Sequence, residues 1–181
     1  GPNDVVIRMS RILLCTTDYQ QWMGLRDHQG WPMAAGHEFS GVIAQKGEQV
    51  LDSFEIGMQV GVMDGYCGKC PACRQGFTGD CPNFKTKALM PDGYYGQKRF
   101  ADYIVVDQTF VLPISNDVPP EHAAFLEPVS TAVQCVKRAR IAPMEDVVVI
   151  GAGTMGLLNA QVAHAFGARV IVTEVDARKI E

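Results

Sequence analysis

The chain has 181 residues, of which 47% are apolar and 20% are charged, and its formal net charge is −4. This composition supports one large or two modest domains with a buried core, and it argues against intrinsic disorder. The acidic balance and the lack of a large basic cluster argue against nucleic acid or an anionic membrane as the main partner.

The first part of the chain, up to about residue 113, is predicted to contain mainly short strands and loops. β-branched and other apolar residues favour strands at 5–15, 37–44, 58–63 and 99–107. Gly and Pro residues punctuate the segments between them. No apolar run reaches the roughly 18 residues of a membrane span. No secretory leader is visible, so we expect a cytoplasmic protein.

Four cysteines lie close together in the segment 67–82, CGKCPACRQGFTGDCP. Their C-x2-C-x2-C-x7-C spacing lets four sulfurs bind one ion, and four thiolates suit a closed structural zinc site. With every position filled by sulfur, any chemistry must take place elsewhere. An iron–sulfur cluster is one alternative, although the bacterial loops place three residues before the last cysteine. The ligands of this predicted site are Cys67, Cys70, Cys73 and Cys81.

A disulfide framework is the other alternative for these cysteines. The chain has six cysteines in total, so a framework is possible on number alone. However, a nucleotide-binding pattern later in the chain indicates a reducing cytosol, where a cysteine cluster binds metal more often than it oxidises.

Helices and a βαβ unit are predicted after residue 113. Residues 119–140 are rich in alanine and lack glycine, which favours helix, and Pro128 predicts two short helices there. The segment 146–176 reads as a strand, a tight turn, a helix that closes at Gly167, and a second strand. Both strands are continuous apolar runs, typical of parallel strands that are buried on both faces.

The turn VVVIGAGTMG has the pattern G-x-G-x-x-G, and here the pattern follows an apolar strand and opens a helix. Gly151 permits the tight turn, Gly153 lets the backbone approach a pyrophosphate, and Gly156 lets helix and strand pack closely. Thr154 and Met155 lie at the helix start, where backbone N–H groups would face the phosphates. The alternative is a glycine turn that serves packing only.

An acidic residue follows the second strand of this unit. Glu174 lies 23 residues after Gly151, close to the position where an acid binds the adenine-ribose hydroxyls. A carboxylate there would repel a 2′-phosphate, so the sequence predicts NAD rather than NADP. Asp176 competes for the same role.

A second set of metal-ligand residues is spread along the chain: Cys15, His37, Glu38 and Glu127. Each is unremarkable alone, since a single cysteine is usually a core residue and a single His-Glu pair is usually on the surface. Their occurrence together with the cysteine loop and the glycine turn is what makes a second metal site a reasonable hypothesis.

The order of these parts resembles a known family. Cys15 with Asp18 is followed by Gly36-His37-Glu38, the four-cysteine loop, Glu127-Pro128 and the glycine turn. The chain is similar over its whole length to the medium-chain zinc-dependent alcohol dehydrogenases. Within them it resembles the branch that contains polyol (sorbitol) and threonine dehydrogenases.

The resemblance implies a role for each matching residue. Cys15 and His37 would bind a catalytic zinc, and Glu127 occupies the position of the third ligand, with Glu38 coordinating directly or alternating with water. Thr17 resembles the hydroxyl that relays the proton of the alcohol.

Three further positions follow from the same comparison. Asp18 resembles the carboxylate that orients His37, and Lys179 resembles a basic residue that contacts the adenosine side of the cofactor. Thr16 departs from the family, which commonly has glycine after the catalytic cysteine. We expect this β-branched residue to restrict the backbone without abolishing metal binding.

The resemblance also implies an α/β and β architecture. It consists of a partly open GroES-like β-barrel over residues 1–115 with the zinc loop at 67–81, connecting helices over 116–143, and the first βαβ unit of an incomplete Rossmann domain over 144–181. The implied activity is hydride transfer between NAD and a secondary alcohol, polyol or 3-hydroxy amino acid, in a homodimer or homotetramer. We expect a chain of this length to be inactive alone, with apolar faces of its two-stranded sheet exposed. The alternative is an inert nucleotide-binding scaffold that keeps only the structural zinc.

Overall fold

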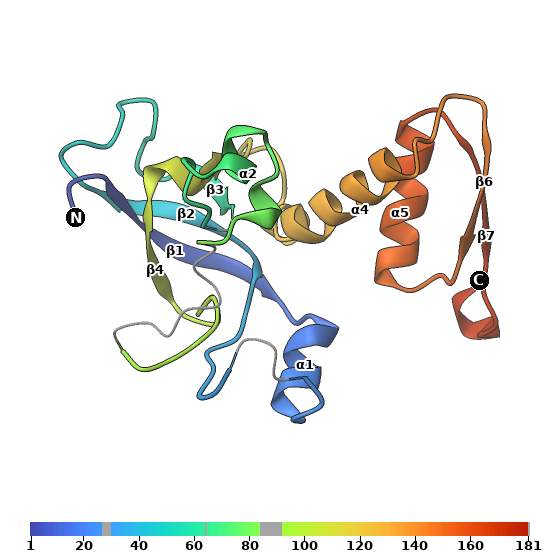
Figure 1. The fold of residues 1–181 in the computed structure, drawn as a ribbon, viewed down its shortest axis with the longest axis horizontal. Coiled ribbons are helices and arrows are strands. Elements are labelled where there is room, and N and C mark those ends of the chain that lie inside the picture. Colours follow the sequence, from blue (N-terminus) through green and yellow to red (C-terminus); the bar gives the residue numbers. More distant parts are fainter. Residues whose placement is uncertain (27–29, 64, 84–91, 181) are drawn as a thin grey trace. The chain divides into compact units, whose positions relative to one another are not determined.

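The computed structural model describes residues 1–26, 30–63, 65–83 and 92–180. These residues form two compact units, Gly1–Phe125 and Leu126–Glu181. The first unit contains a five-stranded sheet and the cysteine loop, and the second contains a pair of parallel strands and the glycine turn (Figure 1). The segment 116–143, predicted to connect two domains, is divided between the two units.

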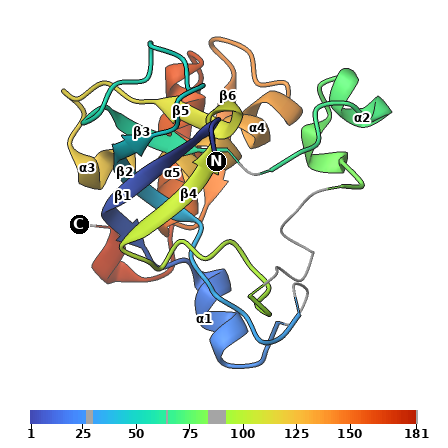
Figure 2. The same ribbon diagram turned by 90° about the vertical axis from the view of Figure 1, so that its left-hand side faces the viewer.

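The first unit is built on a five-stranded sheet with the order β4-β1-β2-β3-β5 (Figures 1 and 2). Each neighbouring pair is antiparallel, and the register between β1 and β2 shifts twice along β1. The four predicted strands are confirmed, and β5 is an addition that the sequence pattern did not indicate. The strands are β1 (Asp4–Leu13), β2 (Glu38–Lys46), β3 (Gln59–Val62), β4 (Tyr103–Asp107) and β5 (Val111–Pro113).

One face of this sheet forms the core. In β4, Ile104 and Val106 are buried whereas Tyr103 and Val105 are exposed, because successive side chains of a strand point to opposite faces. Full burial of one such aliphatic side chain stabilises the fold by about 1.5–3 kcal/mol. The buried cluster consists of Val5, Ile7, Phe39, Ile43, Val50, Val60, Ile104, Val106 and Val111.

Short helices follow the strands of the first unit. α1 (Thr16–Trp22) comes directly after β1, so the strand predicted to run to residue 15 ends at Leu13. α2 (Pro71–Arg74) lies inside the cysteine loop, and α3 (Pro120–Ala123) lies near the end of the unit. Two 3-10 helices cover Thr78–Asp80 (η1) and Gln108–Phe110 (η3).

The second unit begins with α4 (Leu126–Arg138), which carries Pro128 in its first turn, where the missing N–H breaks no helical hydrogen bond. Together α3 and α4 are the two predicted helices. β6 (Asp146–Ile150), α5 (Thr154–Ala165) and β7 (Arg169–Thr173) form the predicted βαβ unit, with β6 and β7 parallel. A 3-10 helix, η4 (Ala177–Lys179), follows. None of the described helices has both the length and the apolar character needed to cross a membrane.

One face of the β6–β7 pair is covered and the other is open. Val147 and Val170 pack against a cluster that contains Val136 of α4 and Ala163 of α5. In Figure 1, α4 and α5 lie on the same side of the two strands. On the opposite face Ile150 is 89% exposed. The expectation of exposed apolar surface on a two-stranded sheet is confirmed.

Candidate functional site

The cysteine loop brings its four sulfurs together. The Sγ atoms of Cys67 and Cys73 are 4.0 Å apart, those of Cys70 and Cys81 are 3.9 Å apart, and all four lie within 4.8 Å of one another. A disulfide would join its sulfurs at about 2.0 Å, and every cysteine of the chain is free, so the disulfide alternative is contradicted. Zinc–sulfur bonds of about 2.3 Å in a tetrahedron place the sulfurs about 3.8 Å apart. The donor set and its spacing therefore fit one zinc ion.

Hydrogen bonds prepare these sulfurs for a cation. Backbone N–H groups of Cys70, Cys73 and Cys67 donate, each at 3.4 Å, to the sulfurs of Cys67, Cys70 and Cys81 respectively. Donors from the backbone of Lys69, the Asn83 amide and the backbone of Cys70 lower the pKa of Cys67 to about 6.

The fourth sulfur behaves in the opposite way. Burial, together with hydrogen bonding to Cys70 and Cys81, raises the pKa of Cys73 to about 12. Four adjacent sulfurs cannot all ionise without a positive charge between them, because like charges raise one another's pKa. A divalent cation removes this conflict, which supports metal binding by the loop.

A second cluster contains Cys15, His37 and Glu38, whose sulfur, ring nitrogen and carboxylate oxygen lie within 4.8 Å of one another. The pairing of β1 with β2 explains the proximity, since Leu13 lies opposite Glu38 in the sheet. His37 Nε2 is 3.8 Å from Glu38 Oε1, and Glu38 is only 9% exposed. Burial raises the pKa of the Cys15 thiol. Sulfur, nitrogen and oxygen donors with room for a fourth partner are typical of an open zinc site.

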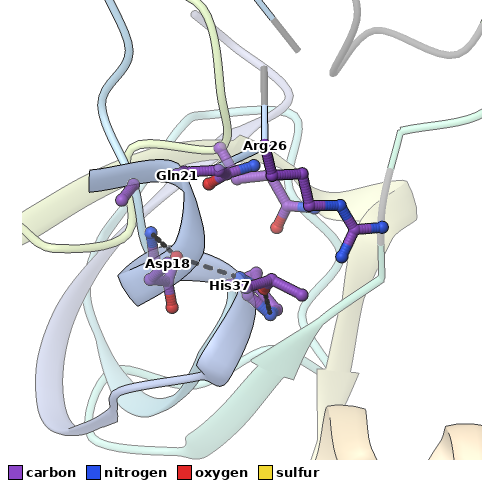
Figure 3. A pocket seen from close by; sticks show the side chains of 8 residues that line it. Asp18, Gln21, Arg26 and His37 are labelled. Carbon is purple, nitrogen blue, oxygen red and sulfur yellow. Dashed lines mark hydrogen bonds and ion pairs between the residues drawn. The ribbon is translucent and has the colours of Figure 1, made fainter. Parts of the chain in front are cut away.

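The buried Asp18 side chain connects the segments that carry these ligands. Its Oδ2 accepts the backbone N–H of Cys15 at 3.0 Å, and its Oδ1 accepts the backbone N–H of Gly36 at 3.1 Å. Oδ1 also lies 3.4 Å from His37 Nδ1 (Figure 3). This contact leaves Nε2 of His37 for a metal. Gly36 has a φ of 97°, and a Cβ there would lie 2.6 Å from the backbone nitrogen of Phe100, so glycine is required beside the ligand.

The other residues of the predicted catalytic set are placed as follows. Thr17 Oγ1 lies 3.5 Å from His37 Nε2, beside the candidate metal position. Thr16 is the first residue of α1 and is not among the described residues with positive φ, so a β-branched side chain fits there. Glu127 lies in the first turn of α4, in the second unit. Its role as a metal ligand stays a prediction.

A small cavity of about 150 Å³ adjoins this cluster. It is lined by Thr17, Asp18 and His37 and by residues that the sequence pattern did not single out, among them Gln21 and Arg26 (Figure 3). Gln21 lies one helical turn after Asp18, so the i, i+3 spacing on α1 would have placed both on one face. Arg26 comes after the helix, where the sequence carries no comparable signal.

The glycine turn has the geometry that its pattern predicts. Gly151 has a φ of 100°, and a Cβ at Gly156 would lie 1.9 Å from the carbonyl oxygen of Gly151. A Cβ added at Gly153 would have no described atom within 4 Å outside its own neighbours and the backbone of its helix. Backbone conformation therefore explains the first glycine and close packing explains the third, but neither explains the second. Gly153 is the N-cap of α5, followed by Thr154 and Met155, so open space and backbone donors lie side by side.

Glu174 closes the turn from the end of β7. Its Oε2 accepts the backbone N–H of Ala152 at 2.8 Å, and its Oε1 accepts the N–H groups of Val175 at 2.7 Å and Asp176 at 3.0 Å. These donors, that of Asp176 first, hold the pKa of Glu174 below its usual range. Lys179 Nζ lies 3.8 Å from Glu174 Oε2.

Asp176, the competing acid, has a different partner. Its carboxylate accepts hydrogen bonds from the Arg178 side chain at 2.9 and 2.7 Å, which lower the pKa of Asp176. Glu174 rather than Asp176 therefore contacts the glycine turn.

Two curated relatives are 34% identical to the chain. They are the L-galactonate-5-dehydrogenase of Escherichia coli and the L-threonine 3-dehydrogenase of Rhizobium rhizogenes, aligned over 100% and 99% of this chain respectively and over 52% of each relative. The chain thus spans about half the length of the curated relatives it matches. A crystal structure of CAD from Helicobacter pylori complexed with NADP(H) superposes with a TM-score of 0.84 at 28% identity, covering 99% of this chain and 54% of that one.

These relatives confirm the family that the residues and motifs resemble, including its branch of polyol and threonine dehydrogenases. They also confirm the predicted fold, with its GroES-like and Rossmann parts. The model of the alcohol dehydrogenase GroES-like domain matches residues 1–116. That match extends over more than half of the chain and includes both clusters of metal-ligand residues. The chain belongs to the alcohol dehydrogenase GroES-like family.

Proposed function

We propose that this chain is part of a zinc-dependent dehydrogenase that transfers a hydride between a nicotinamide cofactor and a secondary alcohol, a polyol or a 3-hydroxy amino acid. The observation that carries the proposal is the cluster of Cys15, His37 and Glu38 beside the buried Asp18. A carboxylate beside the second ring nitrogen is the usual partner of a metal-binding histidine, so the Asp18 contact supports a metal at this cluster.

The protein residues have distinct tasks in this proposal. A zinc ion held by Cys15, His37 and an acidic residue would supply a Lewis acid that lowers the pKa of a substrate hydroxyl. Asp18 holds the His37 ring in place through Nδ1. Thr17 would accept and pass on the proton of the substrate, a role supported by its hydroxyl lying 3.5 Å from His37 Nε2.

The third protein ligand is assigned to Glu38 or Glu127. Glu38 has the support of distance, since its carboxylate lies within 4.8 Å of the Cys15 and His37 donor atoms. Glu127 has the support of its position in the family pattern. A carboxylate in either case makes the ligand set harder than a second thiolate would, which suits hydroxyl-rich substrates.

We assign NAD as the cofactor. The pyrophosphate would lie over Gly153 and the start of α5, and Glu174 would receive the ribose hydroxyls beside Lys179. The low pKa of Glu174 keeps its carboxylate charged, and that charge disfavours a 2′-phosphate. The NADP(H) complex of the Helicobacter pylori protein makes the comparison of the two cofactors a necessary test.

An inert scaffold with only the structural zinc is the competing function, and it leaves the Cys15, His37 and Asp18 geometry without a purpose. The two are separated by assaying the complete gene product with NAD and NADP. The compounds tested as substrates are polyols, L-threonine, L-galactonate and simple alcohols. Zinc-dependent reduction of NAD by one substrate class supports the dehydrogenase, and metal-replete protein that is inactive towards all of these compounds contradicts it.

A further inference from the structure

We propose that Arg26 and Gln21 form a subsite for a carboxylate of the substrate, so that the enzyme prefers a hydroxy acid to the matching neutral polyol. This inference rests on the proposed function and names its substrate class. Both residues line the cavity that also borders Thr17 and His37 (Figure 3). A group bound there would place the rest of the substrate beside the candidate zinc ligands.

Gln21 provides the first argument. It is 4% exposed, and its amide makes no hydrogen bond within the described part of the chain. Among the described residues, Asn159 Oδ1 is the fully buried side-chain atom that lacks a partner, so the Gln21 amide is not sealed from solvent. It borders the cavity, and its N–H groups can donate to a ligand group that replaces water there.

Arg26 provides the second argument. It is exposed, and no acidic side chain of the described residues pairs with it. Nearby cations beyond the cavity are occupied, because Lys98 pairs with Asp92 and Arg99 lies over the ring of Phe39. Within the described residues, then, the guanidinium of Arg26 has no acidic partner, and its planar pair of donors matches a carboxylate.

Asp18 also lines the cavity, and its negative charge would oppose an anion. However, both of its oxygens already accept backbone N–H groups, and Oδ1 also contacts His37. Its charge is therefore partly compensated by these contacts. The volume of about 150 Å³ leaves room for a carboxylate, and the amide of Gln21 with the planar guanidinium of Arg26 matches that planar group.

The test compares D-gluconate with D-sorbitol, which differ in one carboxylate, and adds sorbitol 6-phosphate to separate a carboxylate from a phosphate ester. The complete gene product is assayed as wild type, Arg26→Gln and Gln21→Met, with Arg8→Gln as the control, since Arg8 is an exposed arginine of β1 outside this cavity. Zinc content verifies that each variant is folded.

We expect Arg26→Gln to lower kcat/KM for the acid by about 10- to 100-fold, and Gln21→Met to lower it by about tenfold, with little change for sorbitol. The proposal would be overturned if Arg26→Gln left the ratio of kcat/KM for gluconate to kcat/KM for sorbitol unchanged. It would also be overturned if Arg26→Gln lowered kcat/KM for sorbitol 6-phosphate more than it lowered kcat/KM for gluconate.

If the wild type turns over none of the three compounds, the proposed function fails for this substrate class. The subsite is then tested by calorimetry, which measures how tightly gluconate binds to the wild type and to Arg26→Gln. Gluconate that binds the wild type at least about tenfold more tightly than Arg26→Gln supports the subsite. Equal binding, or no binding to either protein, refutes it.

Discussion

Asp18 and His37 form a pair in which the carboxylate does more than contact the imidazole. Oδ1 lies 3.4 Å from Nδ1 of His37 and 3.1 Å from the backbone nitrogen of Gly36, while Oδ2 lies 3.0 Å from the backbone nitrogen of Cys15. One buried side chain thereby fixes the distance between the two segments that carry the candidate metal ligands.

Replacing Asp18 with Asn tests this relationship. The amide keeps the size of the side chain but removes its charge and one acceptor, so His37 loses the partner that orients it. We expect zinc affinity at the Cys15 site to fall by about 10- to 100-fold, while the four-cysteine site keeps its zinc. Competition with a chelator of known affinity measures both sites, and equal affinity of the variant and wild type at the Cys15 site would contradict the role of Asp18.

Removal of zinc should loosen the cysteine loop and leave the sheet intact. The four sulfurs of the loop repel one another when ionised, whereas the core around Val5, Ile7 and Ile43 is apolar and independent of the loop cysteines. After chelation, hydrogen exchange should accelerate in residues 67–81 and stay unchanged in β1 and β2. Exchange that accelerates equally in the sheet would show that the metal supports the whole unit.

The glycine turn offers a matched pair of variants. At Gly156 an added Cβ would meet the Gly151 carbonyl at 1.9 Å, so Gly156→Ala should lower the free energy of unfolding by roughly 1–3 kcal/mol or more. At Gly153 the space is open, so Gly153→Ala should leave the melting temperature almost unchanged but weaken NAD binding by about tenfold or more. Thermal unfolding and cofactor titration separate the two effects. Unimpaired NAD binding by Gly153→Ala would favour a turn that serves packing only.

Glu174 should make the stability of the nucleotide unit depend on pH. In the folded protein the pKa of Glu174 is lower than that of an ordinary glutamate in the unfolded chain. The charged carboxylate therefore contributes its full stabilisation when the pH is above the unfolded-state pKa, and this contribution is lost as the pH falls through the folded-state pKa. Glu174→Gln should therefore be less stable than wild type at neutral pH, and the two should converge in acid. Urea unfolding between about pH 3 and pH 7 measures the difference. The control is Glu48→Gln, an exposed residue in a turn of the first unit. A difference between wild type and Glu174→Gln that does not change with pH would contradict the prediction.

Much of the fold could be predicted because its signals are local. The run from Val147 to Ile150, the glycines and the acid at 174 follow one another in a strand–turn–helix–strand order that few other folds share. The spacing of the four cysteines likewise predicted that their sulfur atoms lie close together. In contrast, α1 begins at Thr16, immediately after a predicted strand, and its capping depends on Asp18.

The candidate site was harder to predict because its geometry is tertiary. Cys15 meets Glu38 only through the pairing of β1 and β2, which includes two register shifts that no sequence period indicates. Gln21 and Arg26 belong to a helix end and the segment after it, and only the three-dimensional structure shows that they share a cavity with His37.

The most direct test of the central claim is the zinc content of purified protein that has been made metal-replete. The claim is that the chain holds two different zinc sites, a closed one of four sulfurs and an open one at Cys15 and His37. It predicts about two zinc ions per chain in the wild type and in Cys135→Ser, whose exposed cysteine lies outside both clusters, and about one in Cys15→Ser. A wild type with about one zinc ion per chain, unchanged in Cys15→Ser, would contradict the open site and the dehydrogenase built on it.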